Sequence, residues 1–239
     1  MKLYANRNRT LVSLIVFAMG FILVAFAANE LRADIHDDVA ASAEYAQLRE
    51  MNAGAITAAI PATAIPAAAF SAASTGAASL SLYSDINPHF VGWIIVPGTS
   101  IDYPVVRGQD NSTYLNTTFS GSSNPAGAIF IDYRLVDGFD APVSLIYGHN
   151  MRDGSMFAPL VYYLDQEFMT DNPEIIIMTS DGIIQTYRVY AARRTDAWDS
   201  VYSLGFDANE NEQLLILSTC IDGADRNSRL LVYAGRVAS

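Results

Sequence analysis

The sequence predicts an all-β domain with a helical insertion, built either as a sandwich or as a closed barrel. After residue 83, eight short segments are rich in Val, Ile, Tyr and Phe, and residues of the turn-forming types Pro, Gly, Asn and Asp separate them. The segments are 90–96, 101–106, 127–132, 142–148, 174–179, 183–191, 213–219 and 229–237. Regularly punctuated short strands in one domain favour these two architectures.

The N-terminal segment predicts a membrane anchor. Residues 11–28 are largely apolar and carry no charge, and Lys2, Arg7 and Arg9 precede them. A bilayer core needs about 20 such residues, and positive charge on one side places residues 1–10 in the cytoplasm and the rest outside. The competing interpretation is a cleaved signal peptide, because Ala25-Phe26-Ala27 matches the small-x-small pattern of signal peptidase. We favour the anchor, since the run exceeds the usual apolar region of about 7–15 residues.

Residues 29–82 predict a helical continuation followed by a stalk. Apolar residues recur among charged ones up to Met51, at Leu31, Ile35, Val39, Tyr45 and Leu48. Residues 52–82 consist mainly of Ala, Ser, Thr and Pro, a composition with little to bury. An Ala-rich helix is the alternative, weakened by two prolines and a glycine. We therefore expect the folded domain to span residues 83–239.

Two local patterns refine the predicted domain. Asp181-Gly182 is a two-residue hairpin signal between the fifth and sixth segments. Apolar residues at helical spacing predict one helix with Ser155 as its N-cap, and these are Met156, Phe157, Leu160, Val161 and Leu164.

The charge and the chemistry-bearing residues exclude several classes of function. Residues 29–239 hold 11 Arg and no Lys against 25 Asp and Glu, a formal charge of −14, which argues against nucleic acid as a partner. The absence of lysine after Lys2 excludes Schiff-base chemistry. One cysteine, three histidines and no Cys-x-x-Cys pair argue against a structural zinc site. We expect no metal and no cofactor.

The single cysteine lies where a nucleophile could act. Cys220 ends the apolar run 214–220, and Arg229 begins the next predicted strand, so the two residues should lie at facing strand ends. His149 follows another apolar strand, and strand ends in a barrel gather at one rim. Each residue also has a simpler interpretation: an inert buried thiol, a histidine bonded to backbone, and a surface arginine. Imidazolium or guanidinium near a thiol would raise its thiolate fraction.

These residues also carry a family resemblance. Leu217-Ser218-Thr219-Cys220 with an arginine nine positions on, the stretch 147–150 (Tyr-Gly-His-Asn) and residues 87–106 together resemble sortases, nearest to class B. The resemblance implies a closed eight-stranded β-barrel with helical insertions. It implies Cys220 as nucleophile, His149 as general acid and base, and Arg229 as oxyanion stabiliser. It also places Ser218, Thr219, Asn111 and Leu115 in the substrate groove.

The resemblance further implies partners and a location. The substrates would be surface proteins with a C-terminal sorting signal, cut at a Thr–Gly or Thr–Asn bond. The acceptor would be a cell-wall precursor amine or, second, a pilin lysine, and the catalytic domain would face outward on a single-pass anchor. A noncatalytic β-barrel that binds protein or wall is the alternative. Two departures from the family pattern are Ile216 in place of threonine and a connection of only 21 residues, 192–212, where class B members carry a long helix.

Overall fold

The computed structural model describes residues 2–59, 76–204, 213–221, 225 and 227–237, with side chains omitted at 2–15, 30, 33–34, 53–59 and 76–79. The chain forms two compact units, Met1–Ala40 and Ala41–Ser239. Helix α1 (Lys2–Ala59) supplies all of the first unit and the start of the second.

The first unit carries large apolar side chains that are exposed to solvent. Between residues 16 and 26 they are Val16, Phe17, Met19, Phe21, Ile22, Leu23, Val24 and Phe26. Within the described part of the chain, no helix combines the length and apolarity needed to cross a membrane. Residues 11–15 of the predicted anchor lie outside the described side chains.

The second unit begins earlier than the sequence predicts. Ala41, Tyr45 and Leu48 lie three or four positions apart, so they form one stripe on α1, and all three are buried. They belong to the same core cluster as Tyr83 of helix α2 (Gly76–Ile86). The Tyr83 hydroxyl donates to the Leu48 carbonyl at 2.8 Å. Residues 41–52 therefore pack as part of the folded unit, ahead of the expected domain start at residue 83; residues 60–75 of the expected stalk lie outside the described residues.

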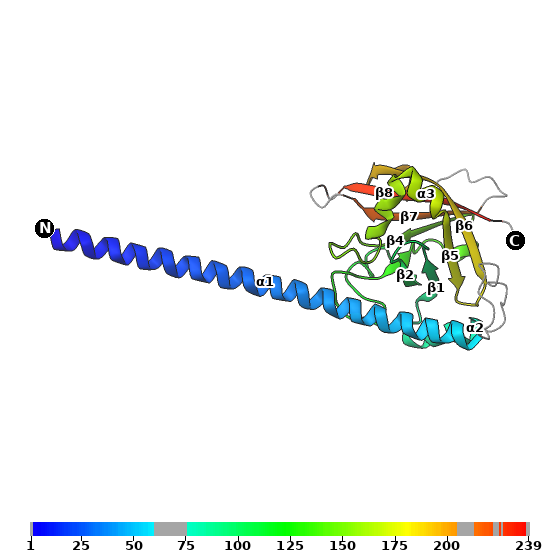
Figure 1. Cartoon of the computed structure of the whole chain (residues 1–239), viewed down its shortest axis with the longest axis horizontal. Helices are drawn as coiled ribbons and strands as arrows, with labels where there is room; N and C mark the ends of the chain where they lie inside the picture. The colour runs from blue at the N-terminus through cyan, green and yellow to red at the C-terminus, as the bar shows by residue number, and fades with distance from the viewer. Residues whose placement is uncertain (1, 60–75, 205–212, 222–224, 226, 238–239) are drawn as a thin grey trace. The chain divides into compact units, whose positions relative to one another are not determined.

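Eight strands close into a barrel, as predicted for the family (Figure 1). They are β1 (Phe90–Ile95), β2 (Asp102–Val106), β3 (Ile129–Ile131), β4 (Val143–Tyr147), β5 (Glu174–Thr179), β6 (Ile184–Asp196), β7 (Leu214–Cys220) and β8 (Ser228–Arg236). Their order around the barrel is β1-β2-β3-β4-β7-β8-β6-β5, with parallel pairing at β2–β3 and β4–β7. Strand β6 is longer than predicted because it pairs with β8 as far as Asp196.

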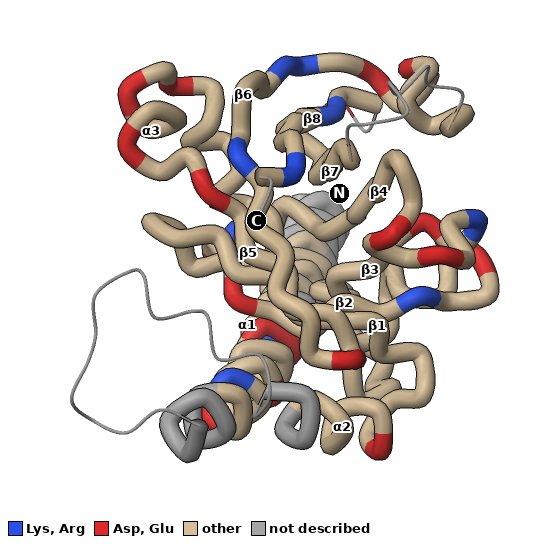
Figure 2. The backbone as a smooth tube through the Cα atoms, turned by 90° about the vertical axis from the view of Figure 1, so that its right-hand side faces the viewer, with Lys and Arg blue, Asp and Glu red and all other residues tan. Residues whose placement is uncertain are grey.

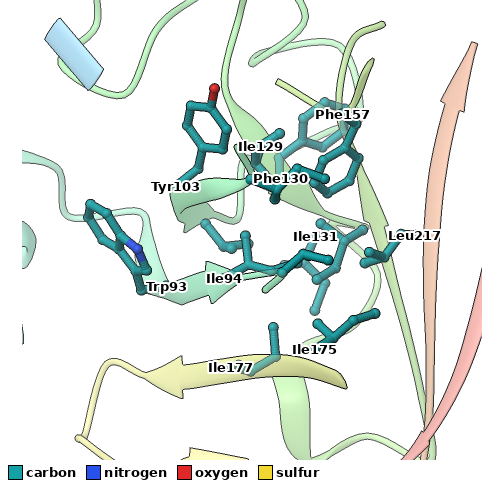
Figure 3. Packing of buried hydrophobic residues seen from close by; sticks show 14 of the residues in the cluster. Trp93, Ile94, Tyr103, Ile129, Phe130, Ile131, Phe157, Ile175, Ile177 and Leu217 are labelled. Atoms are coloured by element: carbon teal, nitrogen blue, oxygen red, sulfur yellow. The ribbon is translucent and has the colours of Figure 1, made fainter. Parts of the chain in front are cut away.

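Alternate side chains of the strands fill the barrel. Figure 3 shows apolar side chains from β1, β3, β5 and β7 pointing toward one another. Ile94, Ile131, Ile175, Ile177 and Leu217 are all fully buried there. Burial of each such side chain contributes about 1.5–3 kcal/mol relative to exposure. This packing holds the strands in one register and so sets where each strand ends.

The predicted helix differs from the observed structure. A 3-10 helix, η2 (Ala158–Leu164), replaces it, and the short helix α3 (Gln166–Asp171) follows. Met156 has a φ of 55°, in the left-handed region, so a helix cannot begin there, and the Ser155 hydroxyl bonds Asp153 at 2.7 Å. Ser155 is thus not the N-cap. Two more 3-10 turns are η1 (Gly138–Asp140) and η3 (Ser200–Ser203). Residues 205–212 of the short connection are not described.

Candidate active site

Strands β7 and β8 place the thiol beside a guanidinium. The two strands run antiparallel, and Cys220 stands opposite Arg229 in their register. Cys220 is a free, half-buried thiol at the end of β7. Arg229 is at the second position of β8, where its Nη1 donates to the Ser228 carbonyl at 3.1 Å. The pairing follows from the antiparallel arrangement, because the last residue of β7 lies opposite a residue near the start of β8.

Strand β4 brings the histidine to the same edge. It runs parallel to β7, so both strands end on one side, with Tyr147 opposite Ser218. The Gly148 amide then donates to the Ser218 carbonyl at 3.2 Å. A Cβ on Gly148 would lie 2.6 Å from Cγ of the fully buried Phe157, so a larger residue there would have to displace that ring. His149 follows directly at the rim.

Two contacts orient His149. Its backbone carbonyl accepts from the Phe157 amide at 2.8 Å. Its Nε2 lies 2.7 Å from the Leu115 carbonyl oxygen. A carbonyl oxygen can only accept, so Nε2 carries the proton and Nδ1 is left as the acceptor of the neutral ring. The loop that bears Leu115 thus selects the tautomer.

All seven residues that the sequence places in the site line one cavity of about 230 Å³. The lining comprises Asn111, Leu115, Phe130, Tyr147, Gly148, His149, Ala197, Tyr202, Ser218, Thr219, Cys220 and Arg229. The other five lining residues were not predicted as site residues: Phe130, Tyr147, Gly148, Ala197 and Tyr202. Phe130 could have been found from strand alternation, whereas Tyr202 reaches the cavity only through the path of the chain after β6.

Aromatic rings form one face of the cavity. Phe130 and Tyr147 have ring centroids 5.1 Å apart, and Tyr147 stacks on Tyr202 at 6.2 Å with an interplanar angle of 18°. The Tyr202 hydroxyl lies 2.9 Å from Ser218 Oγ, two residues before the thiol. Aromatic rings therefore make up this face, and the hydrogen bond between Tyr202 and Ser218 connects it to β7.

One buried polar atom in the lining has no partner. Thr219 Oγ1 makes no hydrogen bond to any described residue, although Thr219 is only 4% exposed. Buried hydroxyls are normally bonded, so this one is an exception among the described residues.

A buried carboxylate lies behind the aromatic face. Asp132, just after β3, is fully buried and accepts from Asn111 Nδ2 at 2.8 Å and from the Tyr147 hydroxyl at 2.9 Å. Arg134 Nε and Nη2 bind its two oxygens at 2.8 and 2.7 Å. Burial raises the pKa of Asp132, but the hydrogen bonds from Arg134, Asn111 and Tyr147 outweigh it and hold that pKa below its ordinary value. Sequence reasoning missed this residue.

Among the described residues, no group of three His, Cys, Asp or Glu side chains is placed to hold a metal ion. The arrangement offers a thiol, an imidazole and a guanidinium around one cavity, a set suited to acyl transfer through sulfur.

Several known proteins are similar to this chain in sequence and in fold. The family model described as the sortase domain matches residues 94–237. Sortase B of Listeria monocytogenes is 31% identical over 176 residues, which are 64% of this chain and 72% of that protein. Clostridium perfringens sortase B superposes with a TM-score of 0.58 at 27% identity, over 66% of this chain and 99% of that one. A Streptococcus pyogenes class B sortase involved in pilus biogenesis gives a TM-score of 0.59 at 26% identity, over 66% and 97%.

Proposed function

Because this chain belongs to the sortase family of cysteine transpeptidases and most resembles class B members, we propose that it cuts a C-terminal sorting signal and joins the surface protein to a cell-wall amine. One observation carries the proposal. Cys220 is the last residue of β7, Arg229 is the second residue of β8, and His149 lies two residues after β4. All three line one cavity. Three neighbouring strands would thus bring a nucleophile, an acid–base group and a cation to the same peptide bond of a substrate.

The first half-reaction forms a thioester. The Cys220 thiolate attacks the carbonyl carbon of a Thr–Gly or Thr–Asn bond in the sorting signal. Before the attack the thiol proton of Cys220 passes to His149. The C–N bond breaks, the amine leaves with that proton from His149, and the acyl group stays on sulfur. Proton transfer by a positioned imidazole contributes typically 10²–10⁴-fold. The half-buried position of Cys220 keeps the thiol accessible to the peptide.

The second half-reaction transfers the acyl group to an amine. His149 takes a proton from the incoming amine, whose nitrogen attacks the thioester carbonyl and expels the Cys220 thiolate. We assign a wall-precursor amine as the acceptor, with a pilin lysine as the second candidate. The second candidate has one support outside this chain, since a similar class B sortase of Streptococcus pyogenes is involved in pilus biogenesis.

Arg229 stabilises the negative oxygen in both steps. A guanidinium stays protonated and presents rigid, planar donors, so it suits an oxygen that becomes charged only in the transition state. Its place across from Cys220 in the β7–β8 register sets the cation beside the sulfur.

We assign the chain to the cell membrane with its catalytic domain outside. The support is the uncharged run 11–28 behind three positive residues, and the exposed apolar side chains between 16 and 26. A single-pass anchor would hold the enzyme where surface proteins emerge.

Replacement of the thiol tests the function. Cys220→Ala should abolish cleavage of sorting-signal peptides by the full chain, because the nucleophile is lost while the fold loses one sulfur at a strand end. Internally quenched peptides with a Thr–Gly or Thr–Asn bond report cleavage, and unfolding curves check the fold. Iodoacetamide should alkylate Cys220 in the folded wild type at neutral pH. Retained cleavage in Cys220→Ala would refute the mechanism, and an unreactive thiol would support the noncatalytic binding module.

A further inference from the structure

The buried carboxylate of Asp132, behind the aromatic face, is hydrogen-bonded to two residues that line the cavity, Asn111 and Tyr147. Asp132 is outside the cavity lining, yet its hydrogen bonds reach residues of that lining from separate parts of the chain. We infer that Asp132 is the positioning residue of the substrate groove, which fixes the walls that grip the peptide while Cys220 and His149 perform the chemistry. The inference rests on the proposed function.

The first wall is set by Asn111. Its Nδ2 donates to Asp132 Oδ2 at 2.8 Å, and its Oδ1 accepts from the Tyr133 amide at 3.1 Å. Because both ends of the amide have a directed partner, its orientation is determined. One N–H and one lone pair remain, and these are what Asn111 can offer to a peptide backbone in the cavity.

The aromatic face is set by the same oxygen. The Tyr147 hydroxyl donates to Asp132 Oδ2 at 2.9 Å, and Tyr147 packs between Phe130 and Tyr202. Fixing the hydroxyl fixes the tilt of the central ring. The two outer rings then follow by packing.

Arg134 joins Asp132 to Tyr202, the outer ring of the same aromatic face. This side chain binds both oxygens of Asp132, and its Nη2 also donates to the Tyr202 carbonyl at 2.8 Å. The Tyr202 hydroxyl in turn lies 2.9 Å from Ser218 Oγ. A continuous set of hydrogen bonds therefore runs from Asp132 to β7, two residues before Cys220.

An amide cannot replace this carboxylate. Oδ1 accepts from Arg134 Nε and the Arg134 amide, and Oδ2 accepts from Asn111, Tyr147 and Arg134 Nη2. Every neighbour is a donor. Asp132→Asn would turn an NH₂ group toward donors and leave at least one of them unpaired, at nearly constant side-chain volume.

Kinetics of full-chain Asp132→Asn test the inference. With the quenched peptides, we expect kcat/KM to fall about tenfold or more, chiefly through KM, because a misplacement near 1 Å can cost on the order of 10²-fold and the groove binds the peptide before chemistry begins. Alkylation of Cys220 by iodoacetamide should keep its wild-type rate. A loss confined to kcat with unchanged KM, or slower alkylation, would overturn the groove role.

Two further variants serve as a second test and as a control. Tyr147→Phe keeps the ring and removes one donor to Asp132; its effect on kcat/KM should be smaller and non-additive with Asp132→Asn. If Asp132→Asn does not fold, unchanged KM in Tyr147→Phe counts against the inference. Asp165→Asn is the matched control, since Asp165 caps α3 away from the cavity. It should leave KM unchanged.

A readout without substrate separates the two proposals. In ¹H–¹⁵N spectra the Asn111 side-chain amide should shift and broaden in Asp132→Asn and stay in place in Asp165→Asn. Wild-type protein that cleaves no peptide would defeat the proposed function, and the amide signal would still decide the positioning role. Active wild type with an unmoved Asn111 signal and unchanged KM in Asp132→Asn would defeat the inference alone.

Discussion

At the scale of single residues, the site depends on which arginine faces the thiol. Register places Arg229 opposite Cys220, whereas Arg236 is at the far end of β8, where its Nη1 bonds Gln213. Geometry and charge can be separated at Arg229, because lysine keeps the charge but loses the planar donors.

Arg229→Lys should lower kcat/KM at least about a hundredfold, since loss of a donor to a developing oxyanion costs on the order of 10²–10³ in rate. Steady-state cleavage of the quenched peptides measures this change. Arg236→Lys is the control on the same strand and should change kcat/KM little. Activity near wild type in Arg229→Lys would exclude the oxyanion role.

Asp132 should also make the free energy of unfolding depend on pH in the acidic range. Its folded-state pKa is below the unfolded value of about 3.9, so its contribution is present above that value and is lost as pH falls through the folded-state pKa. The free energy of unfolding, from urea titrations, should fall more steeply between about pH 5 and pH 2 in wild type than in Asp132→Asn. Asp199, whose pKa Arg193 also lowers, keeps part of the slope in the variant. Identical slopes would show that the carboxylate adds nothing to folding.

At the scale of elements, helix α1 does more than lead to the barrel. The Tyr45 hydroxyl donates to the Gly127 carbonyl at 2.6 Å and accepts from the Phe119 amide at 3.3 Å. The Ser120 amide donates to Glu44 at 2.9 Å. Residues 41–52 thus hold the loop between β2 and β3, whose Leu115 carbonyl orients His149.

Leu48→Ala should therefore destabilise the protein by about 2–5 kcal/mol, the cost typical of a cavity in a core. Thermal unfolding should show a Tm lower by several degrees, at about 2–4 °C per kcal/mol for a domain of this size. Leu82→Ala is the matched control, a helical leucine that is 53% exposed, against 3% for Leu48. Equal Tm values for the two variants would show that residues 41–52 do not contribute to the stability of the folded unit.

At the scale of the whole molecule, charge is distributed unevenly over an acidic domain. Figure 2 shows arginine positions along β6 and β8 and acidic positions around α3. Arg193 pairs with Asp199 at 2.8 Å, so part of this positive charge is neutralised within the fold. Because the domain is acidic, we propose the N-terminal run 11–28, and not the surface of the domain, as the membrane attachment.

Removal of residues 1–28, which include the proposed anchor, tests the assignment. The full chain should sediment with membranes and resist a high-salt wash, whereas residues 29–239 exported with an unrelated signal peptide should be released. Cell fractionation followed by intact-mass measurement checks both forms. A released protein whose mass lacks residues 1–27 would establish the cleaved signal peptide instead.

The sequence alone predicts the eight strands, the closed barrel through its family resemblance, and seven of the twelve residues that line the cavity. It could do so because strand alternation and the antiparallel register of β7 and β8 are local properties, and Cys220 and Arg229 flank a single turn. Only the tertiary structure decided the rest. The donors to Asp132 come from Asn111 and Tyr147, each on another segment, and Arg134 reaches Tyr202 across 68 positions. The 3-10 form of η2 and the docking of α1 likewise depend on distant packing. No local pattern encodes which distant segments meet, so these features follow from closure of the barrel.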